Sequence, residues 1–581
     1  ISKGRRVCRK MECTMKIDVY DVTLRDGAQQ EGINLSVADK LALMPLIESI
    51  GADYIEGGWP GAIPRDTDFY ARADEAPLEN ATLTAFGATR KAGVCAPEDP
   101  QIQGLLASGA SVLTLVAKSD IRHVEQALRT TGEENLAMVR DSVEYLREQG
   151  REVMIDVEHF FDGFHFDPDY TTSVVAECFS AGASCVVLCD TNGGSLPSQV
   201  TRIVTELRER LGRVGFEGAK LGIHAHDDGG CAVANSIAAI EAGCRQVQGT
   251  INGYGERTGN ANLLTILANL ALKTDYEAVG AEQLARLSSV SHAASEITNI
   301  SPYARQPYVG ASAFAHKAGL HASAIRVNPD LYQHIDPLAV GNDMRMLVSD
   351  MAGRASIELK TREFGIDLSQ DKDALSEITR RVKAAEAAGY TYDAADASFE
   401  LLVRDVVGDR PQYFVIEAWR ANIATVGVSN GHGPGTAGQV GSAGGAGEGG
   451  SAYQGVHSGE TFSEATVKLF AGGRRYMRVG EGVGPVDALD QALRTALKNV
   501  YAELAGIELI DFKVRILDTH RGTGAATRDM IELSDGQGIW RTVGVGDDVI
   551  EASWEALTEG YEYGLRRAGV TPWIEGDCPA S

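Results

Sequence analysis

Residues Leu221–Leu263 read LGIHAHDDGGCAVANSIAAIEAGCRQVQGTINGYGERTGNANL, and this stretch decides how the chain folds. It opens as a short apolar strand that breaks into His224-Ala225-His226. A helix of small residues follows, then a second apolar strand and a glycine-rich turn that ends at Asn260. This order of strand, helix and strand is typical of proteins in which β and α elements alternate.

His224 and His226 are candidate ligands of one divalent metal ion. Residues i and i+2 of an extended strand point the same way, so both imidazoles project from the end of one strand. Asp227 and Asp228 follow at the helix start, where carboxylates cap a helix or orient a ligating imidazole. The alternative is a pair of surface histidines. One strand cannot close a metal site, so a third ligand must come from elsewhere.

The same alternation of strand and helix extends from Lys16 to about Ala271. Several of the strands are apolar nearly throughout, as buried parallel strands are. Eight β-then-α units in about 250 residues predict an α/β fold, a TIM (β/α)8 barrel. A doubly wound open sheet is the alternative, but no GxGxxG motif follows an early strand. The expected strands are Ile17–Val22, Asp53–Gly58, Thr82–Gly87, Ser111–Ala117, Glu152–Glu158, Ser184–Asp190, Lys220–His226 and Arg245–Ile251.

Polar residues gather at the expected carboxyl ends of these strands, where barrel enzymes carry their chemistry. Single residues among them, such as Thr191, are explained equally well as helix caps, but the whole set is not. Asp26 is the obvious third metal ligand, with Asn260 as a fourth. Two neutral imidazoles and one carboxylate leave positions open for a bidentate substrate or for water.

Three motifs resemble those of one enzyme family. Leu24-Arg25-Asp26-Gly27-Ala28-Gln29 resembles the first signature of the α-isopropylmalate, homocitrate and citramalate synthases. His224-Ala225-His226-Asp227-Asp228-Gly229-Gly230 resembles their second signature, and the turn from Asn252 to Asn260 resembles their third recurring block. Their metal-dependent barrel is shared with hydroxymethylglutaryl-CoA lyase and carboxyltransferase relatives.

The resemblance implies an acyltransferase that joins acetyl-CoA to a 2-oxo acid. Gly57-Gly58-Trp59-Pro60-Gly61 and His316-Lys317-Ala318-Gly319-Leu320-His321 most resemble the long form of the citramalate synthases, which use pyruvate and serve isoleucine biosynthesis. The alternative is a 2-isopropylmalate synthase, which uses 3-methyl-2-oxobutanoate and serves leucine biosynthesis. A lyase working in the reverse sense and a non-catalytic amino-acid sensor are further classes. An internal repeat at the C-terminal end argues against the lyase, and the intact metal positions argue against the sensor.

The resemblance also implies roles for the metal site. Asp26, His224 and His226, with Asn260 near, would hold Mg²⁺, Mn²⁺ or Zn²⁺. The ion would chelate the 2-oxo acid, polarise its carbonyl and stabilise the developing alkoxide.

The same resemblance places Arg25, Thr191 and Tyr332 against the substrate, with Arg25 on the oxo group. Glu158 looks like the catalytic glutamate of the family. His321 resembles the candidate base that takes a proton from the acetyl methyl group, oriented by Glu158. The alternative readings are a helix-surface histidine for His321 and a half-buried packing residue for Tyr332.

Gly253, Gly255 and Glu256 belong to the third motif, whose glycines let the backbone approach a ligand closely. Contact with CoA is expected there, and a tight connector is the alternative.

The chain has 581 residues, too many for one hydrophobic core. Two related segments near its end, each leading from a strand into a helix, resemble the regulatory domain of these synthases. There the end-product amino acid binds at a dimer interface, so we expect a homodimer with isoleucine as effector, or leucine for an isopropylmalate synthase. The alternative is a domain that only dimerises. The expected parts are a disordered tail (1–15), the barrel (16–285), linker subdomains (286–426), a flexible glycine-rich insert (427–458) and an α+β regulatory domain (459–575).

Charge and composition limit the partners. The net charge of −26 argues against nucleic acid and anionic membranes. No apolar run reaches membrane-spanning length. Nine cysteines lack paired CxxC spacing and read as reduced thiols, which favours a cytoplasmic protein.

Overall fold

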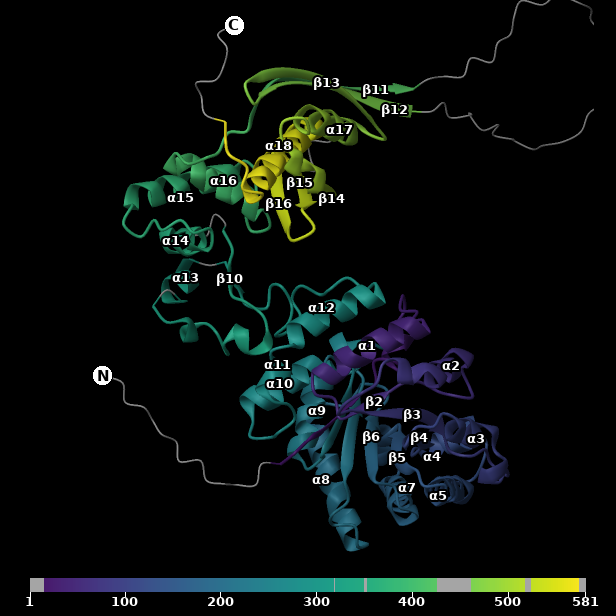
Figure 1. Ribbon diagram of the computed structural model, residues 1–581. Coiled ribbons are helices and arrows are strands. Elements are labelled where there is room, and N and C mark those ends of the chain that lie inside the picture. Colours follow the sequence, from purple (N-terminus) through teal and green to yellow (C-terminus); the bar gives the residue numbers. More distant parts are fainter. Residues whose placement is uncertain are drawn as a thin grey trace, which may run out of the picture. The chain divides into compact units, whose positions relative to one another are not determined.

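The computed structural model describes residues 15–317, 319–325, 327–348, 353–425, 461–517 and 524–573 (Figure 1). They form two compact units. The first contains Ile1–Ala315 and Gln333–Arg345, and the second contains His316–Tyr332 and Met346–Ser581. The division falls within two short strands, β9 (Ala315–His316) and β10 (Arg345–Met346). The glycine-rich insert and all but the last residue of the expected tail lie outside the described residues.

The first unit is a closed barrel of eight parallel strands, β1 to β8 in sequence order (Figure 1). The predicted fold is therefore confirmed, and each strand end lies within two residues of its expected position. Pairing of β1 with β8, from Asp18 opposite Gln246 to Asp21 opposite Gly249, closes the barrel. The strands are β1 (Asp18–Asp21), β2 (Tyr54–Glu56), β3 (Thr82–Ala88), β4 (Val112–Lys118), β5 (Glu152–Glu158), β6 (Cys185–Asp190), β7 (Leu221–Ala225) and β8 (Gln246–Gly249).

Helices follow the strands and cover the outside of the barrel, where apolar side chains of strands and helices share one core. Local sequence starts several of them: Ser36 forms a capping box with Asp39, and Asn262 caps the helix after β8. The helices are α1 (Val37–Ser49), α2 (Pro64–Arg72), α3 (Pro100–Ala107), α4 (Ile121–His123), α5 (Gly132–Glu148), α6 (Phe160–Phe166), α7 (Pro168–Ala181), α8 (Pro197–Arg213), α9 (Ala232–Glu241), α10 (Leu263–Lys273), α11 (Ala281–Leu284) and α12 (Leu287–Thr298).

The second unit contains the expected internal repeat. Three antiparallel strands, β11 (Phe414–Thr425), β12 (Thr461–Ala471) and β13 (Arg474–Gly482), precede α17 (Pro485–Leu497). Three more, β14 (Glu508–Ile516), β15 (Thr527–Ser534) and β16 (Ile539–Gly546), precede α18 (Val549–Arg567). Its other helices are α13 (Gly319–Ile325), α14 (Arg354–Glu363), α15 (Lys372–Ala387) and α16 (Asp396–Val407).

The outer strands of these two sheets carry exposed apolar side chains. In β14, Phe512, Val514 and Ile516 are 37%, 45% and 53% exposed, although β15, with which β14 pairs, buries alternate side chains in the core. β14 is an edge strand of its sheet, and no other described strand pairs with its outer side. The apolar row therefore lies on a strand whose edge is open to pairing.

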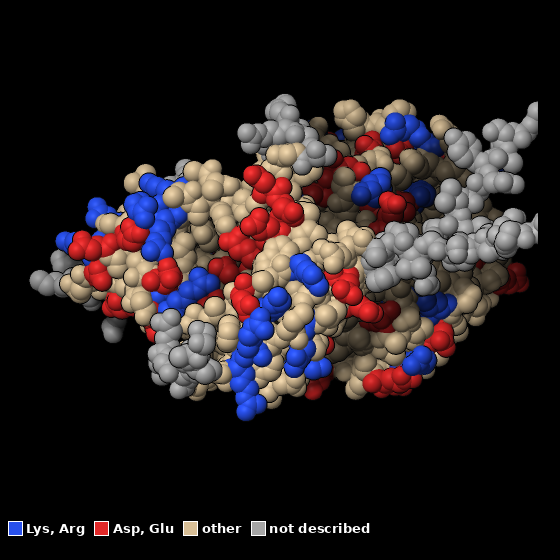
Figure 2. Space-filling model, turned by 90° about the horizontal axis from the view of Figure 1, so that it is seen from above, with Lys and Arg blue, Asp and Glu red and all other residues tan. Residues whose placement is uncertain are grey.

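Charged side chains of both signs are interspersed over the face of the molecule seen in Figure 2. None of the described helices is both long and apolar enough to cross a membrane.

Candidate active site

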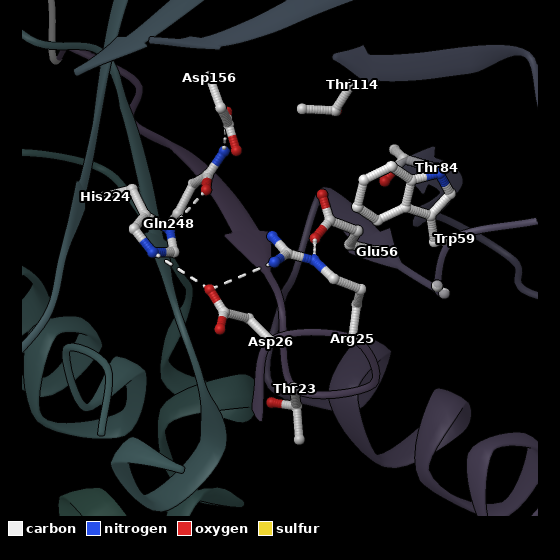
Figure 3. Close-up of polar contacts among 12 residues, drawn as sticks. Thr23, Arg25, Asp26, Glu56, Trp59, Thr84, Thr114, Asp156, His224 and Gln248 are labelled. Carbon is white, nitrogen blue, oxygen red and sulfur yellow. Dashed lines mark hydrogen bonds and ion pairs between the residues drawn. The ribbon is translucent and has the colours of Figure 1, made fainter. Parts of the chain in front are cut away.

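Asp26, His224 and His226 converge at the carboxyl end of the barrel. Asp26 follows β1, and His224 lies on β7 (Figure 3). His226 follows directly after β7. Asp26 Oδ2 lies 3.3 Å from His224 Nε2 and 3.9 Å from His226 Nε2, and the two Nε2 atoms are 3.3 Å apart. All three side chains are buried. They are the one set of His, Cys, Asp and Glu ligand atoms among the described residues that meets the geometry of a metal site.

Asn260 reaches the same cluster through a tight turn. It forms an isolated β-bridge with His226, and its Nδ2 donates to the Tyr254 carbonyl at 3.0 Å. Its Oδ1 is buried and has no hydrogen-bond partner in the described part of the chain. An unpaired buried amide oxygen is costly unless something binds it.

Charges at the cluster suit a cation. Burial would raise the pKa of Asp26, but Arg25 and the two imidazoles outweigh it and hold that pKa far below its usual range. Burial and the neighbouring His224 lower the pKa of His226 to about 4, so this ring is neutral at neutral pH. Burial would also lower the pKa of His224, but Asp26 outweighs it and the pKa is raised. A bound cation would compete with a proton for His224.

These donors fit a divalent metal ion. One carboxylate, two imidazole nitrogens and an amide oxygen form a mixed set that suits Mg²⁺, Mn²⁺ or Zn²⁺. The unpaired Asn260 Oδ1 is the observation that favours a ligand at this position.

Arg25 is fixed beside this cluster. Its Nε donates to Glu56 Oε1 at 2.5 Å, and its Nη1 lies 3.5 Å from Asp26 Oδ2 (Figure 3). Its Cζ lies 3.8 Å from the centroid of the Phe86 ring. Glu56 is held in turn by the Tyr20 hydroxyl at 2.8 Å. Glu56 was not predicted as a site residue, because its role depends on its contact with Arg25, which follows a different strand.

Two further polar residues lie behind His224 and were not predicted. Gln248 Oε1 accepts from His224 Nδ1 at 2.8 Å, and Gln248 Nε2 donates to Asp156 Oδ1 at 3.0 Å. Two glutamines, Gln246 and Gln248, inside the barrel strand RQVQGTI are the sequence signal that could have identified Gln248.

Glu158 and Thr191 lie at the ends of neighbouring strands. Glu158 forms an ion pair with Lys118, at the end of β4. Thr191 Oγ1 accepts from the backbone N–H of His159 at 2.8 Å, which leaves its hydroxyl hydrogen to donate. The carboxyl end of the barrel therefore carries both residues, and their roles toward substrate stay predictions.

His321 and Tyr332 belong to the second unit. Their rings stack with centroids 4.1 Å apart, and the His316 ring lies 6.1 Å from that of His321. Tyr332 is 39% exposed. A base role for His321 and substrate contact by Tyr332 stay predictions.

The turn with Gly253, Gly255 and Glu256 closes tightly on itself. A Cβ at Gly255 would lie 2.3 Å from Asn260 Nδ2, and one at Gly259 would lie 2.0 Å from the Gly253 carbonyl oxygen. The turn therefore needs glycine to place Asn260 at the cluster. Contact of this turn with CoA remains a prediction.

Comparison with known proteins covers nearly the whole chain. The HMGL-like family matches residues 16–291, the homocitrate synthase post-HMGL domain-like family matches 308–389, and the LeuA allosteric (dimerisation) domain matches 452–565.

The curated relatives carry related names. A protein of Streptomyces coelicolor named (R)-citramalate synthase is 54% identical over 97% of this chain and 100% of its own length. A Synechocystis protein of the same name is 46% identical over 94% of this chain and 96% of its own. A Methanopyrus kandleri protein named probable 2-isopropylmalate synthase is 29% identical, over 95% of this chain and 99% of its own.

Proposed function

The chain belongs to the (R)-citramalate synthase family, and we propose that it condenses acetyl-CoA with pyruvate to give (R)-citramalate and CoA. The observation that carries the proposal is the 54% identity with the Streptomyces enzyme over its full length. The alternative, 2-isopropylmalate synthase, has weaker support, since the relative of that name is 29% identical.

In the proposed reaction the acetyl methyl carbon loses a proton and bonds to the carbonyl carbon of pyruvate. Water then cleaves the thioester, which releases CoA as a thiol and leaves the new carboxylate on the product. Asp26, His224, His226 and Asn260 would hold a divalent cation, which supplies Lewis acidity at the 2-oxo group when bound.

The residues around this site have proposed tasks. Arg25, fixed through Nε, has other N–H groups with which to hold the oxo oxygen. Thr191 would donate its hydroxyl hydrogen to the pyruvate carboxylate. Glu158 would take part in proton transfer. His321 would be the base that removes a proton from the acetyl methyl group. Tyr332 would contact the substrate. Gly253, Gly255 and Glu256 would contact CoA.

A thiol-release assay tests the reaction. Acetyl-CoA is supplied with pyruvate or with 3-methyl-2-oxobutanoate, after chelation and re-addition of Mg²⁺, Mn²⁺ or Zn²⁺. We expect faster CoA release with pyruvate. Faster release with the branched acid would establish the alternative, and no release with either acid and any metal would contradict a synthase. His226→Ala should lose both turnover and Mn²⁺ binding.

We also propose that the chain acts in isoleucine biosynthesis in the cytoplasm, as a homodimer regulated by isoleucine. The match to the LeuA allosteric (dimerisation) domain and the apolar edge of β14 support dimerisation. The free thiols of the described cysteines suit a reducing compartment.

A cavity of about 450 Å³ in the second unit is a candidate effector site. Asp487, Asp490 and Glu508 line it and suit an ammonium group, Arg494 suits a carboxylate, and Leu509 and Phe512 suit an aliphatic side chain. Calorimetry with isoleucine and with leucine tests this proposal. We expect isoleucine to bind and to inhibit, and Asp487→Asn to weaken both effects. Preference for leucine, or no binding of either amino acid, would contradict it.

A further inference from the structure

We propose that Asp156 and Gln248 are positioning residues that fix the tautomer of His224, so that Nε2 presents a lone pair to the metal site. The inference rests on the metal site proposed above. Within the described part of the chain, neither residue forms a hydrogen bond or ion pair with Asp26 or His226, so Gln248 acts through His224 and Asp156 acts through Gln248.

The three side chains form a chain of hydrogen bonds across three strands. Asp156 lies on β5, Gln248 on β8 and His224 on β7 (Figure 3). Asp156 Oδ1 is 3.0 Å from Gln248 Nε2, and Gln248 Oε1 is 2.8 Å from His224 Nδ1. All three residues are buried, and Gln248 has no exposed surface. A partner lost from this chain would therefore leave a buried polar group unpaired, which is costly.

The order of donors and acceptors follows from Asp156. An ionised carboxylate only accepts hydrogen bonds, so it selects the amide NH2 group of Gln248. The amide oxygen must then face His224, where it can only accept. His224 Nδ1 must therefore carry the hydrogen, and the Nε2 of the neutral ring keeps its lone pair for a metal ion.

Reversal of the amide would have the opposite effect. An NH2 group facing Nδ1 would need a lone pair there, and the proton of the neutral ring would move to Nε2. That tautomer cannot bind a metal ion through Nε2. Burial and the charge of Glu56 raise the pKa of Asp156 to about 7, so the experiment is set at about pH 8, where the carboxylate is ionised.

Exchange of the two partner groups provides the test. In Asp156→Asn the new amide can donate to Gln248 Oε1, so it no longer fixes the orientation of the glutamine. In Gln248→Glu the new carboxylate faces the carboxylate of Asp156, which accepts from the Gln248 amide in the wild type. The double variant Asp156→Asn/Gln248→Glu restores the order. Its new amide donates to its new carboxylate, and that carboxylate also accepts from His224 Nδ1.

Gln246→Leu is the matched control for Gln248→Leu. Gln246 lies on the same strand, is equally buried, and contacts Cys185 and Met154 instead of His224. Mn²⁺ affinity is measured by calorimetry on the full-length apoprotein, and the thermal midpoint of each variant shows that it is folded.

We expect Asp156→Asn and Gln248→Leu to weaken Mn²⁺ binding by ~10–100-fold, as loss of outer-shell partners does elsewhere. Gln248→Glu should lose less, because a carboxylate at this position still accepts from His224 Nδ1. The double variant should recover most of the loss seen in Asp156→Asn, and Gln246→Leu should bind like the wild type. Wild-type affinity in folded Gln248→Leu, or a double variant no better than Asp156→Asn, would overturn the inference while leaving the metal site intact. A wild-type protein that binds no Mn²⁺ would overturn the metal site as well.

Discussion

Arg25 shows how much of this site is built before substrate arrives. Its guanidinium is held by Glu56 through Nε, lies near Asp26 and covers the Phe86 ring. Burial would lower its pKa, but Glu56 and Asp26 outweigh it, so the group stays charged. A lysine offers one point charge and cannot reproduce this fork.

We therefore expect Arg25→Lys to reduce kcat/KM for thiol release with pyruvate by ~10²–10³-fold, as removal of a transition-state donor does. Mn²⁺ affinity should change little, because Arg25 is not a ligand. Arg72→Lys, at an exposed arginine paired with Glu75, is the control and should behave like the wild type. Wild-type kcat/KM in Arg25→Lys would contradict a role at the oxo group.

Single site residues could be predicted from the sequence where their role depends only on local backbone geometry. His224 and His226 were predictable because alternate residues of a strand share a face. Glu56, Asp156 and Gln248 were not assigned, because their partners lie on other strands and the order of the strands alone does not show which of their side chains meet.

The turn between β8 and α10 is the element on which Asn260 depends. Gly259 has φ of +97°, and a side chain there would meet the backbone oxygen of Gly253 at 2.0 Å. Backbone cannot give way as a flexible side chain can, so the turn itself would have to open.

Gly259→Ala should therefore weaken Mn²⁺ binding and lower stability by about 1–3 kcal/mol. Gly93→Ala is the matched control, since Gly93 has φ of +72° and nothing within 4 Å of the added Cβ. Calorimetry and urea unfolding compare the two variants. Equal effects of the two changes would show that backbone strain alone, and not closure of the turn, is responsible.

Helix α18 carries a carboxyl group that should make stability depend on pH. Burial raises the pKa of Glu559 to about 7, against the opposing effect of Ser398 and Arg410. The folded state therefore binds this proton more tightly than the unfolded state, in which Glu titrates near 4.5. The stabilisation is fully present below the unfolded pKa and is lost as pH rises through about 7.

Glu559→Gln keeps a neutral group at this position. Its unfolding free energy relative to the wild type should rise by roughly 2–3 kcal/mol between pH 5 and pH 8, measured by urea titration at both values. Glu551→Gln, at an exposed position of the same helix, should show no such change. A pH-independent difference for Glu559→Gln would contradict the raised pKa.

The whole molecule is expected to assemble through its second unit. The apolar row of β14 lies along an open strand edge, which is a surface that a second copy could cover.

The order of the barrel strands was predictable at this scale because the alternation of strand and helix is regular. The first strand of each C-terminal half was not recognised, because the repeat was identified from the segments that lead directly into the two helices.

If the proposed dimer forms through β14, Val514→Asp should raise its dissociation constant by ~10-fold or more, because the change would place a charge in the apolar row. Light scattering during gel filtration at several concentrations measures this shift. Val483→Asp is the control, since Val483 is 93% exposed and lies outside the strands. An unchanged dimer in Val514→Asp would place the interface elsewhere.

The division of the chain into two units limits where the protein can be truncated. The chain leaves the barrel unit at Ala315, returns for Gln333–Arg345 and leaves again. The returning piece buries Val340 fully, and the Val340 carbonyl accepts from Ser288 Oγ at 2.8 Å. A chain cut at Ala315 would thus lack part of its own barrel unit, and a protease nick there should leave two fragments that stay together. The compact unit that contains the barrel is therefore not one uninterrupted stretch of sequence.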